Sequence, residues 1–258
     1  MKVIATYNLK GGVGKTATAV NLAYLAACDG QRTLLWDLDA QGAASFYLRV
    51  RPRLDGGAAE LIEKKKNLPR AIRSTDFERL DLVPADFSYR NLDLELNDYK
   101  KSTLRLRKLL RDVEHDYDLV FLDCAPSMSL VSENVFNMAD VLLVPLIPTH
   151  LSLRAFEQLV SFRAGLESAH ADILPFFSMV DRRKRLHREL IVEFARSHPE
   201  VLRTYVPYAS QIEHMGEHRA PVNVYADASV GGRAFRALWQ ALAARLGLAM
   251  GTPSSAPA

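Results

Sequence analysis

The chain of 258 residues carries a net charge of +3, and 48% of its residues are hydrophobic. This apolar content excludes a largely disordered chain, its two cysteines exclude a disulfide scaffold, and no apolar run approaches the roughly 20 residues that span a bilayer. A strand pattern follows Met1 almost at once, so we expect a cytoplasmic protein without a signal peptide.

The start of the chain has the pattern of a strand, a helix and a second strand. Residues Lys2 to Asn8 are rich in Val, Ile, Thr and Tyr, which favours a strand. A glycine cluster follows, and apolar residues then predict a helix from Lys15 to about Asp29, ended by Gly30. The second expected strand is Thr33 to Leu38. The short connections indicate a βαβ unit.

Strands and helices alternate along the rest of the chain. Continuous apolar runs predict strands at 119–123 and 141–145, as in the interior of a parallel sheet. The other expected elements are loop and turn over 40–57, a helix over 58–78 interrupted near Pro69, a strand over 80–84, irregular or helical structure over 87–98, an amphipathic helix over 102–113, a helix over 151–167, a strand over 173–180, a helix over 183–197, a short final strand over 201–206 and a closing helix over 226–248.

This alternation predicts the fold class and the domain organisation. We expect an α/β fold with a single doubly wound, mostly parallel sheet that has helices on both faces. No internal repeat or long linker interrupts it. We therefore expect one domain over residues 1–250, followed by a flexible tail over 251–258.

The glycine cluster between the first strand and the first helix predicts a phosphate-binding loop. Glycine lets backbone N–H groups converge on phosphate oxygens, and the helix that begins near Lys15 directs the positive end of its dipole to the same point. Lys15 would neutralise the β- and γ-phosphates, and the Thr16 hydroxyl would bind Mg²⁺. The residues expected to hold the nucleotide are Lys10, Gly11, Gly12, Val13, Gly14, Lys15, Thr16 and Ala17.

The loop departs from the commonest phosphate-loop pattern, which has glycine where this chain has Leu9. Lys-Gly-Gly-Val-Gly-Lys-Thr at 10–16 resembles the deviant phosphate loop of the ParA/MinD ATPases, and the resemblance covers nearly the whole chain. In that family two subunits hold their nucleotides between them, and the first lysine reaches the partner's phosphates. The resemblance implies a P-loop NTPase fold, an ATP-bound homodimer and catalytic roles for Lys10 and Lys15. A solvated loop lysine is the alternative for Lys10.

Two further segments resemble the switches of this family. Residues 34–42 resemble the first switch, with Ala40 where proline is usual, and the resemblance makes Asp39 the acid that positions the attacking water near Mg²⁺. Asp37 is expected to support the loop structurally. Residues 119–127 place Asp123 at the end of an apolar strand, the Walker B arrangement, where it would hold Mg²⁺ through a water. Cys124 is expected to be a small buried residue.

Later segments resemble the ParA branch. Residues 177–183 and 203–208 resemble segments that line the adenine pocket, which implies adenine contacts from Met179, Asp181 and Pro207. ParA proteins bind DNA without sequence specificity, through basic residues that neutralise phosphates. The candidate DNA contacts are Arg182, Arg183, Arg203, Arg219, Arg233 and Arg236, with Lys184, Arg185 and Arg188 in the densest basic cluster. A solvated helix face is the alternative for 182–188.

Three other functions were weighed against this one. A MinD-like membrane cycler needs an amphipathic last helix, but Trp239 and Leu242 are more economically explained as core residues. A reductase similar to the nitrogenase iron protein needs two cluster-binding cysteines per subunit, and Cys28 falls on the first helix. A module that binds nucleotide without turnover would lack an acid such as Asp39.

The resemblance thus implies an ATPase that uses ATP and Mg²⁺, turns over slowly and is stimulated by a ParB-like or other adaptor, typically through a short basic segment. We expect it to bind non-specific DNA as a homodimer, to associate with the nucleoid rather than with membrane, and to segregate or position a chromosome, plasmid or protein complex. A MinD-like membrane-cycling ATPase is the alternative. Neither the cargo nor the role of residues 58–113 follows from the sequence.

Overall fold

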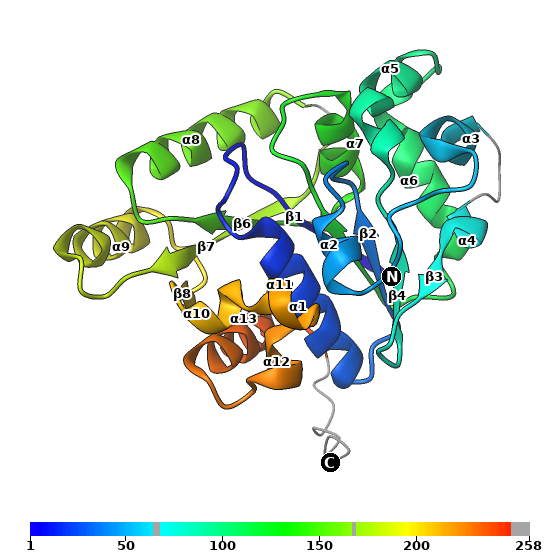
Figure 1. Cartoon of the computed structure of the whole chain (residues 1–258). Helices are drawn as coiled ribbons and strands as arrows, with labels where there is room; N and C mark the ends of the chain where they lie inside the picture. Colours follow the sequence, from blue (N-terminus) through cyan, green and yellow to red (C-terminus); the bar gives the residue numbers. More distant parts are fainter. Residues whose placement is uncertain (64–67, 167–168, 249–258) are drawn as a thin grey trace.

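One mixed sheet organises the computed structural model, which describes residues 1–63, 68–166 and 169–248 (Figure 1). The strand order is β3-β4-β2-β5-β1-β6-β7-β8, and every neighbouring pair is parallel except β3 with β4. The strands are β1 Lys2–Thr6, β2 Thr33–Asp37, β3 Arg73–Ser74, β4 Leu80–Val83, β5 Leu119–Asp123, β6 Val141–Leu146, β7 Asp172–Val180 and β8 Tyr205–Pro207. The predicted α/β fold with a single, mostly parallel sheet is confirmed.

Helices cover both faces of this sheet. On one face α1 and α11 to α13 pack on a core that includes Phe121 and Trp239, and on the other α3 to α9 pack on a core that includes Trp36 and Phe136 (Figure 1). The helices are α1 Lys15–Cys28, α2 Ala43–Tyr47, α3 Gly57–Glu63, α4 Leu68–Ala71, α5 Leu92–Asn97, α6 Arg105–Leu110, α7 Leu130–Met138, α8 His150–Ala164, α9 Arg185–Ser197, α10 Ser210–Glu213, α11 Met215–His218, α12 Val222–Tyr225 and α13 Val230–Leu246, with 3₁₀ turns η1 Phe87–Asn91, η2 Ser102–Leu104 and η3 Arg111–Val113.

The burial of the central strands is typical of a parallel sheet. Every residue of β2, β5 and β6 is buried, because both faces of the sheet are covered by helices. In this arrangement the carboxyl ends of β1, β2 and β5 lie at one edge, with Thr6 and Asp37 both in register with Asp123. The phosphate loop and the two switch segments all begin at this edge, which is the usual place for a ligand site in such folds.

Several expected elements were wrong. The expected loop over 40–57 contains α2, the expected helix over 58–78 includes strand β3, and the final strand is Tyr205–Pro207 rather than 201–206. Helix α7 was not expected at all, nor were α10 to α12 between β8 and α13. These short helices depend on distant contacts: in α7 the buried Asn134 accepts a hydrogen bond from Leu106 N at 3.0 Å and donates to Ser102 O at 2.8 Å. The expected tail over 251–258 lies outside the described residues.

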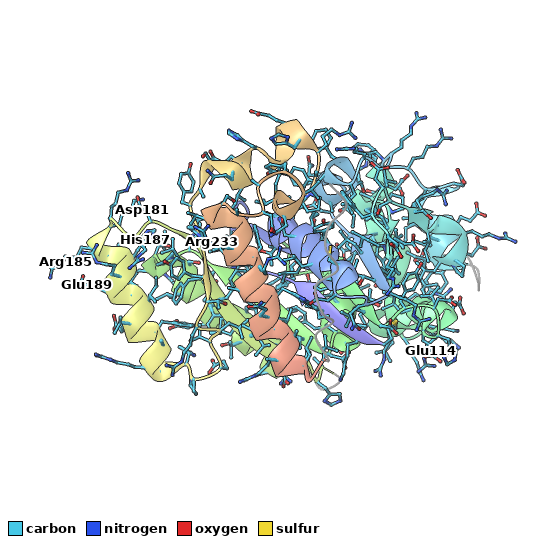
Figure 2. The ribbon with its side chains drawn as sticks, turned by 90° about the horizontal axis from the view of Figure 1, so that it is seen from below. Glu114, Asp181, Arg185, His187, Glu189 and Arg233 are labelled. Atoms are coloured by element: carbon cyan, nitrogen blue, oxygen red, sulfur yellow. The ribbon has the colours of Figure 1, made fainter. Side chains whose placement is uncertain are left out.

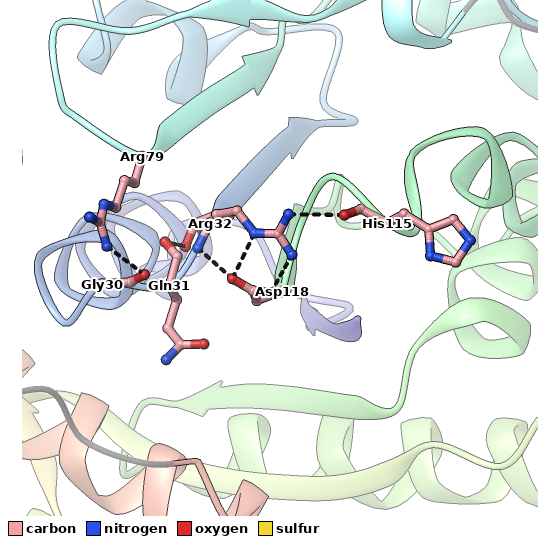
Figure 3. Close-up of polar contacts among 7 residues, drawn as sticks. Gly30, Gln31, Arg32, Arg79, His115 and Asp118 are labelled. Atoms are coloured by element: carbon pink, nitrogen blue, oxygen red, sulfur yellow. Dashed lines mark hydrogen bonds and ion pairs between the residues drawn. The ribbon is translucent and has the colours of Figure 1, made fainter.

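At the amino ends of the strands, a forked ion pair joins Arg32, just before β2, to Asp118, just before β5 (Figure 3). The Arg32 guanidinium donates to both carboxylate oxygens of Asp118, at 3.1 and 2.7 Å, and to the carbonyl of His115 at 2.9 Å. Arg79 caps the end of α1 next to it by donating to Gly30 O at 3.0 Å. The Arg32 hydrogen bond lowers the pKa of Asp118.

We expect Arg32→Met to lower the urea midpoint of unfolding slightly, because both partners are about half exposed and solvent screens the pair. A lowered pKa in the folded state means that the stabilisation is present at neutral pH and is lost as the pH falls through that pKa. The difference between wild type and variant should therefore shrink in acid. The control is Arg154→Met, at an exposed arginine on α8 whose side chain makes no hydrogen bond or ion pair within the described part of the chain. An undiminished difference at low pH would contradict the assignment.

Candidate nucleotide site

The phosphate loop joins β1 to α1 in a conformation that glycine permits. Gly12 and Gly14 have φ values of 69° and 91°, in the left-handed region that side chains disfavour. At Gly14 an added Cβ would also lie 3.0 Å from the Ser178 hydroxyl, so the loop touches β7 there. The buried Asn8 fixes the start of the loop: it accepts a hydrogen bond from Lys10 N at 2.9 Å and donates to Pro145 O at 2.8 Å.

Lys15 is buried at the first position of α1, and its ammonium folds back over the loop. Its Nζ donates to the Lys10 carbonyl at 3.0 Å, and only 7% of the residue is exposed. Burial lowers the pKa of Lys15, while the negative charges of Asp123 and Asp39 oppose this shift. A hydrogen bond within the loop thus joins the side chain of Lys15 to the backbone of Lys10. A cation held there can neutralise an anion that the backbone N–H groups also bind.

The environment of Asp123 shows whether the residues present could hold a metal ion. It is fully buried, and neither carboxylate oxygen has a hydrogen-bond partner among the described residues. Burial raises the pKa of Asp123 well above its ordinary value and the charges of Asp37 and Asp39 add to this, whereas the Thr16 hydroxyl and Lys15 lower it. A carboxylate with free lone pairs beside a hydroxyl is a donor set that suits Mg²⁺, which takes oxygen ligands and retains several waters. The residues present therefore fit the expected cation.

Two carboxylates at the end of β2 have different environments. Asp37 is buried and accepts hydrogen bonds at 2.8 Å from both the backbone N and the hydroxyl of Ser45, so it anchors α2 as a structural residue. Burial raises the pKa of Asp37 to about 6. Asp39 is only partly buried, and among the described residues its carboxylate accepts a single hydrogen bond, from Gln41 N at 3.0 Å. Asp39 is thus the acid of the pair that can face a ligand.

The segment after β5 is tied to β1. The Tyr7 hydroxyl donates to the Ser127 carbonyl and lies 3.3 Å from the Ser132 hydroxyl at the start of α7. Burial raises the pKa of Tyr7 to about 12, so the phenol remains a donor. Cys124 is buried, as expected, and burial raises the pKa of its thiol, which leaves it unreactive. Cys28, by contrast, is exposed on α1.

The three predicted adenine contacts lie at the carboxyl ends of β7 and β8. Met179 adopts a left-handed φ of 53° where the pairing of β7 with β8 is irregular, and Pro207 is in register with Val180. Asp181 follows β7, but its carboxylate is occupied by Arg183, which donates from its backbone N at 3.0 Å and from Nε at 2.9 Å. The Arg183 hydrogen bonds lower the pKa of Asp181 to about 2.

The six predicted DNA contacts lie on or beside several different elements. Arg182 and Arg183 are exposed before α9, and Arg203 is exposed before β8. Arg233 lies on the first turn of α13, where Figure 2 labels it. In α9 Arg185 pairs with Glu189 at 2.6 Å. Arg236 pairs with Asp227 on α13. Arg219 is set apart, because its guanidinium caps α2 by donating to Phe46 O at 3.1 Å.

The last helix packs in the core. Phe235, Leu238, Trp239 and Leu242 of α13 are each at most 2% exposed, which confirms their interpretation as core residues. Among the described residues no helix is both long and apolar enough to cross a bilayer.

Sequence reasoning missed the residues that position the site. Asn8, Ser45 and Tyr7 act through hydrogen bonds to segments 8 to 137 residues away in the chain. For Asn8 a signal was present, since a polar residue that ends an apolar strand beside a glycine run is a candidate for fixing the loop. The partners of Tyr7 and Ser45 had no such local signal.

Comparison with known proteins agrees with this geometry. A family model described as an AAA domain matches residues 1–173. The chromosome-partitioning ATPase Soj of Treponema pallidum is 29% identical over 95% of this chain and 98% of its own, and the chromosome partitioning protein ParA of Myxococcus xanthus is 30% identical over 95% and 88%. The crystal structure of cobyrinic acid a,c-diamide synthase from Mycobacterium smegmatis with bound ADP and magnesium superposes with a TM-score of 0.81 at 25% identity, covering 99% of this chain and 100% of that one. With its deviant phosphate loop and both carboxylate switches at one edge of the sheet, the chain belongs to the ParA/Soj-type ATPase family.

Proposed function

We propose that this protein is an ATP-dependent molecular switch of the partitioning type, which binds ATP with Mg²⁺ and hydrolyses it. The observation that carries the proposal is the meeting of Lys15, Thr16, Asp39 and Asp123 around one glycine loop. Two features support it further: the relatives are named as partitioning ATPases, and a structural neighbour carries ADP and magnesium.

Each residue of this group has a distinct role in the proposal. Lys15 would neutralise the phosphates from inside the loop. Thr16 and Asp123 would hold Mg²⁺, whose positive charge offsets that of the phosphates. Asp39 orients a water for attack on the terminal phosphate and receives a proton from it. Met179 and Pro207, at the carboxyl ends of β7 and β8, would contact the adenine ring.

The proposed active form is a dimer in which Lys10 of each subunit completes the other's site. Within the described residues the Lys10 side chain makes no hydrogen bond or ion pair, while its backbone N and O are both used by the loop. We therefore expect Lys10→Ala to keep the loop and to change ATP affinity of the monomer by less than about threefold, yet to abolish dimerisation on a non-hydrolysable ATP analogue. Sedimentation velocity measures both species. Lys108→Ala, at an exposed lysine on α6, is the control, and a normal dimer in Lys10→Ala would remove Lys10 from the interface.

The proposed target of the dimer is DNA of any sequence. Exposed arginines at the start of α9, before β8 and on α13 offer phosphate contacts without base recognition. Figure 2 labels Arg233 of α13 among them. We expect co-sedimentation with duplex DNA that requires ATP and weakens as salt rises. The double variant Arg182→Glu with Arg233→Glu should bind at least about tenfold more weakly, whereas Arg154→Glu should not. Equal binding by both variants would place the DNA surface elsewhere.

The same experiment with anionic liposomes tests the membrane alternative. Binding to liposomes but not to DNA would assign the protein to a MinD-like cycle. Binding to DNA alone supports a nucleoid-based ATPase that segregates or positions a cargo, with turnover stimulated by an adaptor protein.

A further inference from the structure

A groove runs beside the first switch, outside the nucleotide site. It encloses about 650 Å³ between α2 and α11, and its walls include Gly42, Phe46, Val50 and Arg219. A second hollow of about 510 Å³ continues from it and shares Arg49, Val50 and Arg51. No predicted site residue other than Arg219 lies on these walls, so neither the nucleotide site nor the proposed DNA surface accounts for them.

Two arginines hold the walls of the groove in place. Arg49 donates to the carbonyls of Arg219 and His218, at 3.0 and 3.2 Å, and thereby caps α11. In return Arg219 donates to Phe46 O at 3.1 Å, capping α2, and its guanidinium lies 4.7 Å from the centre of the Phe46 ring. Both arginines have left-handed φ values, 58° and 46°. Such reciprocal capping holds the groove open before a ligand arrives, which reduces the ordering cost of binding.

The rim of the groove carries a cluster of arginines, of which Arg49 and Arg73 form ion pairs, with Asp76 at 3.3 Å and with Asp55. Arg51 and Arg53 are exposed, and neither side chain makes a hydrogen bond or an ion pair among the described residues. Arg73 pairs with Asp55 at 3.4 Å, but that carboxylate is 86% exposed, so the pair is weak and exchangeable. The floor is apolar by contrast: Phe46, with 46% of its surface exposed, lies beside Val50.

We propose that this groove is a docking site for an acidic segment of a partner protein, one that also presents an apolar side chain. Carboxylates of the segment would pair with Arg51, Arg53 and Arg73, and its apolar side chain would cover Phe46. A nucleic acid backbone matches the charge but offers nothing to an apolar floor, so the protein segment fits better. The partner is opposite in charge to the basic adaptor segment that the family resemblance implies, and the two would use different surfaces.

The groove is continuous with the first switch. Gly42 N donates to Asp39 O at 2.9 Å, and Phe46 N donates to Gly42 O at 2.9 Å, so two backbone hydrogen bonds connect Asp39 to the groove floor. If ligands of the nucleotide site move this segment, the acidic segment and the nucleotide alter each other's affinity by the same factor. This linkage rests on the proposed function, whereas docking itself does not.

The test uses the full chain and a fluorescein-labelled peptide of Glu and Asp residues around a central Leu-Phe pair. A matched peptide with Gln and Asn in place of the acids, and a labelled DNA duplex, are the comparison probes. Fluorescence anisotropy is measured for wild type, for Arg51→Glu with Arg53→Glu, for the milder Arg51→Gln with Arg53→Gln, and for Lys108→Glu with Arg196→Glu. The last pair reverses two exposed charges outside the groove.

We expect the acidic peptide to bind wild type in a salt-sensitive manner and the amide peptide to bind at least about tenfold more weakly. The groove reversals should weaken binding about tenfold, the Gln variant less, and the control pair not at all. Equal binding by groove and control variants, or no binding of the acidic peptide, overturns the proposal. So does DNA binding that depends on Arg51 and Arg53 without peptide binding, which would make the groove a nucleic acid surface. Peptide binding that persists in Lys15→Ala but does not respond to nucleotide in wild type would support docking and remove the linkage alone.

Discussion

Lys15→Ala is expected to weaken ATP binding by at least about a hundredfold, because it removes the ammonium from the phosphate loop. The group sits buried near two carboxylates, Asp39 and Asp123, and opposes part of their charge. Without it, a polyphosphate would enter a site whose side chains are net negative, and the backbone N–H groups of the loop would have to hold it alone. Isothermal titration with ATP and Mg²⁺ measures the loss.

Two comparisons make the result specific to nucleotide binding. Thermal unfolding without nucleotide should show that Lys15→Ala remains folded. Lys10→Ala should retain near-normal affinity, because the Lys10 side chain makes no hydrogen bond or ion pair among the described residues. Tight ATP binding by a folded Lys15→Ala protein would refute the phosphate-loop assignment.

The parts of this site that could be predicted from sequence are those whose geometry is set by residues close together in the chain. The loop glycines, Lys15 and Thr16 are consecutive, and they follow a strand and begin a helix, so one segment specifies their geometry. Asp123 ends a strand that is apolar throughout, which predicts both its burial and its place at the sheet edge. The structure pairs β2 with β5 and so brings Asp37 opposite Asp123, a strand order that the sequence analysis did not predict.

The parts that could not be predicted depend on contacts between distant segments. Helix α2 spans five residues, too few for a periodic pattern, and it is held by Asp37 at one end and by Arg219 at the other. Arg219 appeared to sequence analysis as one basic residue among several, yet it caps a helix 173 residues away. Likewise Asp181 was expected to face the nucleotide, and its pairing with Arg183 two residues later was not anticipated.

Asp39→Ala should separate binding from turnover. Asp39 is only partly buried, and its carboxylate accepts one hydrogen bond among the described residues, from Gln41 N, so we expect its removal to leave the fold and the phosphate loop intact. We expect ATP affinity to remain within about threefold of wild type and the rate of phosphate release to fall by about a hundredfold or more, since water orientation and proton acceptance are both lost. Such a protein should accumulate as an ATP-bound dimer that stays on DNA.

Asp37→Ala is the matched control, two residues earlier on the same strand end. Asp37 is fully buried and accepts two hydrogen bonds from Ser45 at 2.8 Å, so its loss leaves donors unpaired in the core and should lower thermal stability, unlike the loss of Asp39. If turnover falls only in step with stability in both variants, Asp39 has a structural role like its neighbour. If Asp39→Ala is stable, binds ATP and releases phosphate at the wild-type rate, another group positions the water, and the switch mechanism proposed for this segment fails at its central residue.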